Sequence, residues 1–138
     1  MTIANSNVAS QIVKQTQSDV GTVHFFDHLA VVEFNEGTHI DLKSVRQTLD
    51  DVLNHFGYSK PFGIIANRVN SYSISLLDIK DARATLPNLT AYGIVSYNSA
   101  TRMNAEIESS FCEWNDICFN NLYEGLDTIH KRVIRKSA

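Results

Sequence analysis

Apolar residues recur every three or four positions over residues 41–56, which is the spacing of one face of an α-helix. Asp41 stands where an N-cap is expected, and Gly57 can supply a left-handed stop. Ile40 and Val45 are placed to pack across the cap as a hydrophobic staple. The pattern therefore predicts a helix in this segment. Its apolar face consists of Leu42, Val45, Leu49, Val52, Leu53 and Phe56.

Five other segments have the patterns that are typical of β-strands. Residues 22–26 and 29–34 flank a two-residue turn, which predicts a β-hairpin. Residues 62–66 form an unbroken apolar run, as expected of a strand whose two faces are both buried. The other two predicted strands span residues 91–97 and 117–119.

Three more helices are predicted between and after these strands. Ser75 and Asp78 match a capping box, so we expect a helix over residues 76–86 that ends before Pro87. Helical spacing predicts a third helix with a core-facing stripe of Met103, Ile107, Phe111 and Trp114. The last helix has an apolar line of Leu122, Leu126, Ile129 and Val133.

The order of these elements predicts an α/β fold with a mainly parallel five-stranded sheet, opened by an antiparallel hairpin, and about four helices. Right-handed crossovers would place the connecting helices on one face of the sheet. Both faces of the strands are apolar, so the second face also needs cover. A partner subunit or the N-terminal segment around Ile12 and Val13 could provide that cover, and we expect a homodimer.

The chain has 138 residues, enough for one domain with a real core. We expect residues 10–138 to form that single domain, and residues 1–9, which are small and polar, to be frayed or disordered. No apolar run is long enough for a membrane span or a secretion signal, which predicts a cytoplasmic protein. A net charge of -3 and a pI near 5.9 argue against nucleic acid as a partner.

The residues that most often carry catalysis or metal binding form no known motif here. Cys112 and Cys118 do not have the spacing of a redox pair or a zinc site, and a strand and a turn separate His24 from His28. No phosphate-binding loop, nucleophile elbow or zinc-protease motif is present. We therefore expect no metal and no other cofactor, and we favour a protein that is not an enzyme. The acidic residues Glu106, Glu108, Glu113 and Asp116 are predicted to form a solvated helix face.

The turn between the third strand and the second helix reads Asn67-Arg68-Val69-Asn70-Ser71-Tyr72-Ser73. With the element order over residues 20–134, it resembles the SpoIIAA-like fold, which STAS domains share with the SEC14 group. The string itself is similar to that of small uncharacterised bacterial STAS/SEC14 domain-containing proteins. STAS regulators carry a phosphorylatable serine in a D-S-S-G motif at this turn, whereas this chain has Asn70 before Ser71 and Tyr72 after it.

The resemblance implies a non-catalytic interaction or regulatory module, with a protein as its partner. Its alternative implication is a SEC14-like binder or carrier of a small apolar or anionic ligand. Ser71 and Ser73 are candidates for phosphorylation or anion binding beside a helix N-terminus, whereas the capping box accounts for Ser75. Arg68 is either an anion clamp at the carboxyl edge of the sheet or the partner of a nearby carboxylate. The predicted binding or regulatory site comprises Asn67, Arg68, Asn70, Ser71, Tyr72 and Ser73.

Overall fold

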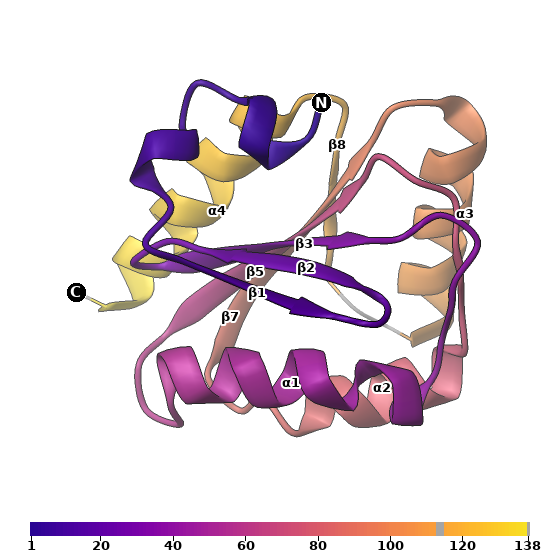
Figure 1. Ribbon diagram of the computed structural model, residues 1–138, viewed down its shortest axis with the longest axis horizontal. Coiled ribbons are helices and arrows are strands. Elements are labelled where there is room, and N and C mark those ends of the chain that lie inside the picture. Colours follow the sequence, from indigo (N-terminus) through magenta and orange to yellow (C-terminus); the bar gives the residue numbers. More distant parts are fainter. Residues whose placement is uncertain (113–114, 138) are drawn as a thin grey trace.

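The computed structural model describes residues 1–112 and 115–137, whose strands form a six-stranded sheet with helices on both faces (Figure 1). The strand order is β1-β2-β3-β5-β7-β8. The first two neighbouring pairs are antiparallel and the last three are parallel. The α/β class predicted from the sequence is therefore confirmed. The strands are β1 (Lys14–Ser18), β2 (Gly21–Phe25), β3 (Leu29–Phe34), β5 (Phe62–Arg68), β7 (Leu89–Ser96) and β8 (Ile117–Phe119).

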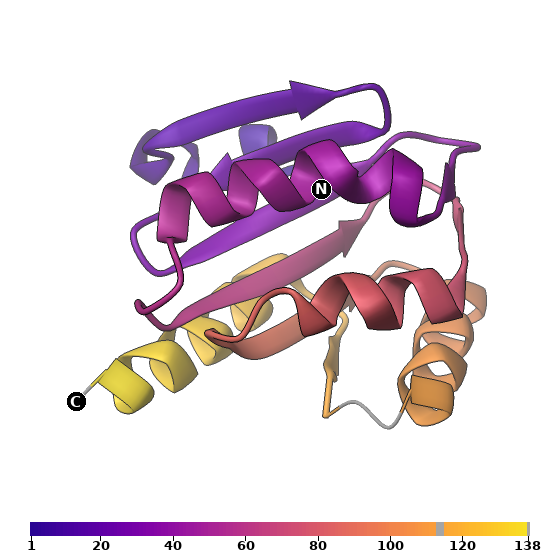
Figure 2. The ribbon, with the colours of Figure 1, turned by 90° about the horizontal axis from the view of Figure 1, so that it is seen from below.

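Three helices connect the parallel strands, and a fourth follows the last strand. They are α1 (Leu42–Phe56), α2 (Leu76–Ala84), α3 (Ser99–Cys112) and α4 (Leu122–Ser137). Figure 2 shows α1 and α2 side by side across one face of the sheet, with α4 behind the other. A small parallel sheet joins β4 (His39–Ile40) to β6 (Ser73–Ile74). No helix within the described ranges combines the length and the hydropathy that a membrane crossing requires.

Each face of the sheet has its own apolar core. On the first face, Val32 and Ile64 pack with Val52 and Phe56 of α1. On the second face, alternate residues of the same strands pack against α4. A Cβ atom at Gly63 would overlap the Ile129 side chain, so the glycine allows α4 to lie close to the sheet. The buried residues of this second core are Ile3, Leu29, Val31, Ile65, Val95, Phe119, Leu122, Ile129 and Val133.

The sheet has six strands where the sequence predicts five, because β1 was missed. Its sequence is Lys-Gln-Thr-Gln-Ser, which has no apolar residue to reveal a strand. The strand lies at the edge of the sheet and pairs only with β2. Its pairing depends on main-chain hydrogen bonds along the whole of β2, which a side-chain pattern does not report.

The N-terminal segment also differs from the expectation of a frayed end. Two short 3₁₀-helices, Ile3–Asn5 and Ala9–Gln11, fold over the second face of the sheet. Ile3 is fully buried in the core of that face. One large aliphatic side chain can anchor a segment that is otherwise small and polar. The cover of the second face therefore comes from α4 and this segment, which removes the need for a partner subunit there.

The prediction that the apolar stripe of α3 faces the core is wrong. Met103, Ile107 and Phe111 are 61%, 58% and 59% exposed, and Ala105 on another side of the helix is the buried residue. Trp114 lies outside the described residues. Helix α3 touches the sheet mainly at β7 and β8 and packs against it less extensively than α4 does. The larger apolar side chains of α3 are therefore left in solvent.

The helix starts agree with the sequence in one case and differ in the other. Asp41 caps α1 as predicted: its carboxylate accepts a hydrogen bond from Ser44 N at 2.9 Å, and Ser44 Oγ accepts one from Asp41 N. Gly57 ends this helix with a φ of 73°. At α2 the Ser75 side chain makes no capping bond. The Asp78 carboxylate instead accepts a hydrogen bond from Leu42 N in the first turn of α1, at 3.1 Å.

Candidate functional site

Two of the six residues of the predicted site lie at the carboxyl end of β5, where strand alternation places them on opposite faces of the sheet, and the other four follow in the loop and in β6. Asn67 points to the second face, beneath the N-terminal segment, while Arg68 points to the first face, toward α3. Asn70 is held by its own side-chain amide, which donates to the Phe34 carbonyl at 3.0 Å. The six residues therefore do not form one cluster, because Asn67 and Arg68 lie on opposite faces of the sheet.

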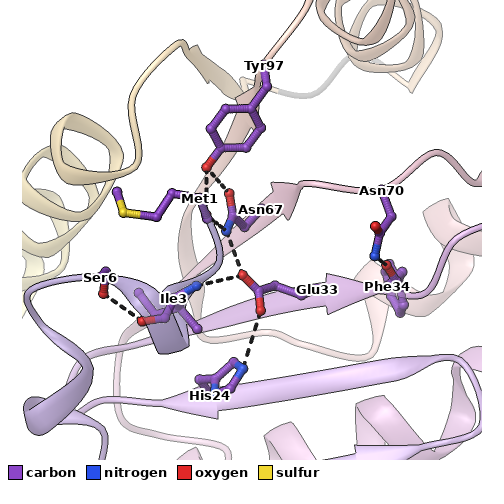
Figure 3. A network of polar contacts seen from close by, with 9 residues as sticks. All are labelled: Met1, Ile3, Ser6, His24, Glu33, Phe34, Asn67, Asn70 and Tyr97. Carbon is purple, nitrogen blue, oxygen red and sulfur yellow. Dashed lines mark hydrogen bonds and ion pairs between the residues drawn. The ribbon is translucent and has the colours of Figure 1, made fainter.

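Asn67 is at the centre of a buried polar network on the second face (Figure 3). Its side chain is 1% exposed and donates through Nδ2 to Glu33 Oε2 at 2.6 Å and to the Met1 carbonyl at 2.9 Å. The Tyr97 hydroxyl lies 2.6 Å from Asn67 Oδ1 and 3.0 Å from the same Met1 carbonyl. These contacts join the ends of β3, β5 and β7 to the start of the chain.

Glu33 is the charged group of this network. Besides Asn67, its carboxylate accepts a hydrogen bond from Ile3 N at 2.9 Å and faces His24 Nε2 at 3.4 Å. Burial alone would raise the pKa of Glu33, but the hydrogen bonds from His24, Ile3 N and Asn67 outweigh burial and lower it. Glu33 was not among the predicted site residues. A glutamate inside an apolar strand was the only signal in the sequence.

On the first face, Arg68 forms a buried ion pair with Glu108 of α3. The two guanidinium nitrogens lie 3.3 and 2.5 Å from the two carboxylate oxygens, and the Arg68 side chain is 9% exposed. Burial would lower the pKa of Arg68, but Tyr72 and Glu108 raise it above its ordinary value. The sequence left two alternatives for Arg68, an anion clamp or the partner of a nearby carboxylate. In the structure its guanidinium is paired with the Glu108 carboxylate.

A second buried ion pair, Arg83 with Asp116, lies on the same face. Its nitrogen-to-oxygen distances are 2.8 and 2.6 Å, and the guanidinium stacks 3.6 Å from the centre of the Tyr92 ring. Burial raises the pKa of Tyr92. Glu108 and Asp116 were expected on a solvated helix face, and this expectation is wrong for both. Each neutralises an arginine that the fold buries.

Both ion pairs border an interior cavity between the first face of the sheet and helices α1 and α2. Its volume is about 80 Å³. Most of its wall is apolar, with side chains from β3, β5, β7, α1 and α2, among them Val52, Ile64 and Ala82. Tyr72 also lines it and packs edge-on against Phe34, with ring centres 5.2 Å apart. Burial raises the pKa of Tyr72, which keeps its hydroxyl neutral.

Ser71 and Ser73 lie at the surface in the loop that leads to α2. The main-chain N–H of Ser71 donates to the Glu36 carboxylate, and its carbonyl accepts from Gly37 N at 2.7 Å. Ser73 is in β6, and its hydroxyl lies 2.7 Å from His39 Nδ1. The Glu36 carboxylate thus already accepts the hydrogen bond of the Ser71 N–H, whereas the neighbour of the Ser73 hydroxyl is the His39 imidazole.

The described residues contain no group of three or more His, Cys, Asp or Glu side chains placed to hold a metal ion. Cys118 is a free, half-buried thiol, and burial raises its pKa, which disfavours the reactive thiolate. The side chain of Cys112 lies outside the described part of the chain.

Comparisons with known proteins identify the fold. No family model matches the sequence, and no curated protein is similar to it. Among solved structures, the fold is similar to that of an uncharacterised DUF3478-family protein from Shewanella loihica PV-4, which has a SpoIIAA-like fold. The match covers 84% of this chain and 90% of that chain, with a TM-score of 0.53 and 13% sequence identity. The chain therefore has a SpoIIAA-like fold, as its resemblance to that group predicted.

Proposed function

We propose that this chain is a non-catalytic cytoplasmic binding module whose interior cavity holds a small apolar ligand. The observation that carries the proposal is the apolar cavity between the sheet and helices α1 and α2. Ligand sites are typically apolar hollows with a few polar groups at fixed positions. Here Arg68, Arg83, Tyr72 and Tyr92 are those groups.

The charges around the cavity favour an uncharged ligand over an anion. Arg68 and Arg83 are each paired with a carboxylate, Glu108 and Asp116, so the four groups sum to zero. An anion would have to displace one of these carboxylates from a buried guanidinium, which would leave that carboxylate unpaired. Of the two ligand types implied by the SEC14 resemblance, the apolar one fits this wall better.

The volume of the cavity sets the size of the ligand. At about 80 Å³ it is roughly half of the ~150 Å³ engineered cavity that admits benzene. A group of a few carbon atoms fits without movement of the helices. A larger molecule requires α1 and α2 to move apart.

Xenon binding followed by NMR tests this proposal, because xenon enters dry apolar cavities. Xenon should shift the methyl resonances of Val52 and Ile64. Ala82→Met, which fills the cavity from α2, should abolish these shifts, while Ala84→Met on the exposed side of the same helix should preserve them. Parent protein whose cavity methyl groups do not respond to xenon would contradict the proposal.

A regulatory role for the loop is part of the same proposal. Of the two predicted serines, Ser73 is the better acceptor of phosphate, because the Glu36 carboxylate beside Ser71 would repel the added charge. Treatment of the protein with a cell extract and ATP, followed by peptide mass spectrometry, should find the phosphate on Ser73. Exclusive modification of Ser71 would contradict this assignment.

The second candidate function is protein interaction, and the exposed stripe of α3 favours it. Met103, Ile107 and Phe111 lie four residues apart on one side of the helix, and each is more than half exposed. Three adjacent large apolar side chains in solvent are typical of an interaction surface. We propose a second copy of the chain as the partner, in keeping with the homodimer expected from the sequence.

A further inference from the structure

Residues 1–11 make no main-chain hydrogen bond to the strands of the sheet in the described part of the chain. In the described residues, the main-chain-to-main-chain hydrogen bonds of this segment are internal, such as Ser6 N to the Ile3 carbonyl at 3.1 Å. The first such bond to the sheet is Val13 N to the Phe25 carbonyl, at 2.8 Å. The segment can therefore detach without breaking the β-ladder.

Side chains from the ends of three strands hold the main chain of this segment (Figure 3). Glu33 of β3 accepts from Ile3 N, and Asn67 of β5 donates to the Met1 carbonyl. Tyr97, which follows β7, lies within hydrogen-bond distance of the same carbonyl. These groups recognise a carbonyl and an N–H two residues later. Neither contact depends on the side chains of the bound segment.

One large side chain of the segment is fully buried, while several of the other residues are exposed. Ile3 is fully buried against a pocket of apolar residues. Its neighbour Ala4 is exposed. Farther along, Val8 and Gln11 line an open crevice of about 780 Å³ between the segment and α4. The buried apolar cluster to which Ile3 belongs also includes Val31, Ile65, Val95 and Leu122.

We infer that this place is a peptide-binding groove, which the segment of residues 1–6 occupies within the same chain. Its partner is a short peptide segment that presents a main-chain carbonyl and, two residues later, an aliphatic residue with a free N–H. The ionised Glu33 carboxylate disfavours acidic residues beside that N–H. The groove is on the opposite face of the sheet from the cavity, so it is independent of the proposed function.

The tethered segment competes with any partner because it is present at a high effective concentration. A free peptide should therefore bind weakly until the tethered segment is released. In the full chain, Ile3→Asp should release it, since the carboxylate cannot enter the apolar pocket. Ala4→Asp is the matched control, because it adds the same charge at a neighbouring exposed position.

Fluorescence anisotropy with a labelled peptide of residues 1–9, MTIANSNVA, measures this competition. The Ile3→Asp chain should bind the peptide at least about tenfold more tightly than the parent or the Ala4→Asp chain. The same peptide with Ile3→Asp should not bind, and adding Glu33→Ala to the Ile3→Asp chain should remove the binding. Equal affinities of the Ile3→Asp and Ala4→Asp chains would overturn the inference.

Hydrogen exchange in the parent chain tests whether the segment detaches locally, and this test does not require a variant to fold. The amides of Ile3 and Asn7 should exchange at least about 100-fold faster than the amide of Ile65 in the central strand, because the segment opens locally. Exchange of all three amides at one common rate would mean that the segment opens only when the whole fold does, and the inference would fail.

Discussion

Residues that are adjacent in this chain can make contacts on opposite faces of the sheet. Asn67 and Arg68 are adjacent at the end of β5, yet one holds the N-terminal segment and the other holds α3. The sequence identifies Arg68 as an unusual charged residue after a buried strand and groups Asn67 with it in the predicted site. It does not identify their partners, because Glu33 and Glu108 are 34 and 40 residues away in the chain and no local pattern links residues at such distances.

The lowered pKa of Glu33 predicts a pH-dependent contribution to stability. Its folded-state pKa lies below the ordinary value of 4.5, so the stabilisation is complete above about pH 4.5. It is lost as the pH falls through the folded-state pKa. Glu33→Gln should lower the free energy of unfolding by about 1–3 kcal/mol at pH 7, since hydrogen bonds to a charged group are lost.

Urea denaturation of the Glu33→Gln variant and the parent, from pH 7 down to pH 3, checks this prediction. The difference between the two proteins should shrink as the solution becomes acidic. Glu36→Gln on an exposed loop is the control and should show a smaller difference at pH 7. A Glu33→Gln effect that is constant over the whole pH range would argue against an ionised Glu33 in the network.

Helices with the same apolar period have opposite relations to the core. The stripe of α1 packs on the sheet, whereas that of α3 faces solvent. Periodicity indicates which residues share a helix face, but the position of the helix relative to the sheet decides whether that face is buried. The connections of α3 to the rest of the fold include Ala105 and the ion pair of Glu108, neither of which produces a periodic signal.

The start of α2 supplies a prediction about helix capping. Ser75→Ala should change the free energy of unfolding by less than about 0.5 kcal/mol, because the Ser75 side chain makes no capping bond. Asp78→Ala should cost about 1 kcal/mol, because it leaves Leu42 N at the start of α1 without its acceptor. Thermal or urea denaturation of the two variants measures both values. A larger loss of stability for Ser75→Ala than for Asp78→Ala would instead support the predicted capping box at Ser75.

At the scale of the whole molecule, the element order was sufficient to predict the fold. Alternating strands and helices fixed the parallel part of the sheet, and a short turn fixed the hairpin between β2 and β3. The sequence did not reveal β1 or the anchored N-terminal segment. Both are polar stretches whose structure depends on contacts with other parts of the chain, such as the pocket that receives Ile3.

The oligomeric state tests the proposed role of the α3 stripe. Light scattering at tens of micromolar should give the mass of a dimer for the parent chain. Ile107→Lys should give a monomer of nearly unchanged stability, since the Ile107 side chain is 58% exposed. Gln47→Lys, an exposed position on α1 and not on α3, should remain dimeric. A monomeric parent would contradict the proposal.

The two outer strands of the main sheet limit how copies of this chain can associate. β1 is composed of polar residues with a lysine at its start, and β8 has only three residues. An incoming strand would find little apolar surface on β1 and few main-chain groups on β8, so neither side favours fibre-like growth of the sheet. The chain can therefore carry an apolar stripe on a helix without the aggregation that a similar stripe would promote on an outer strand.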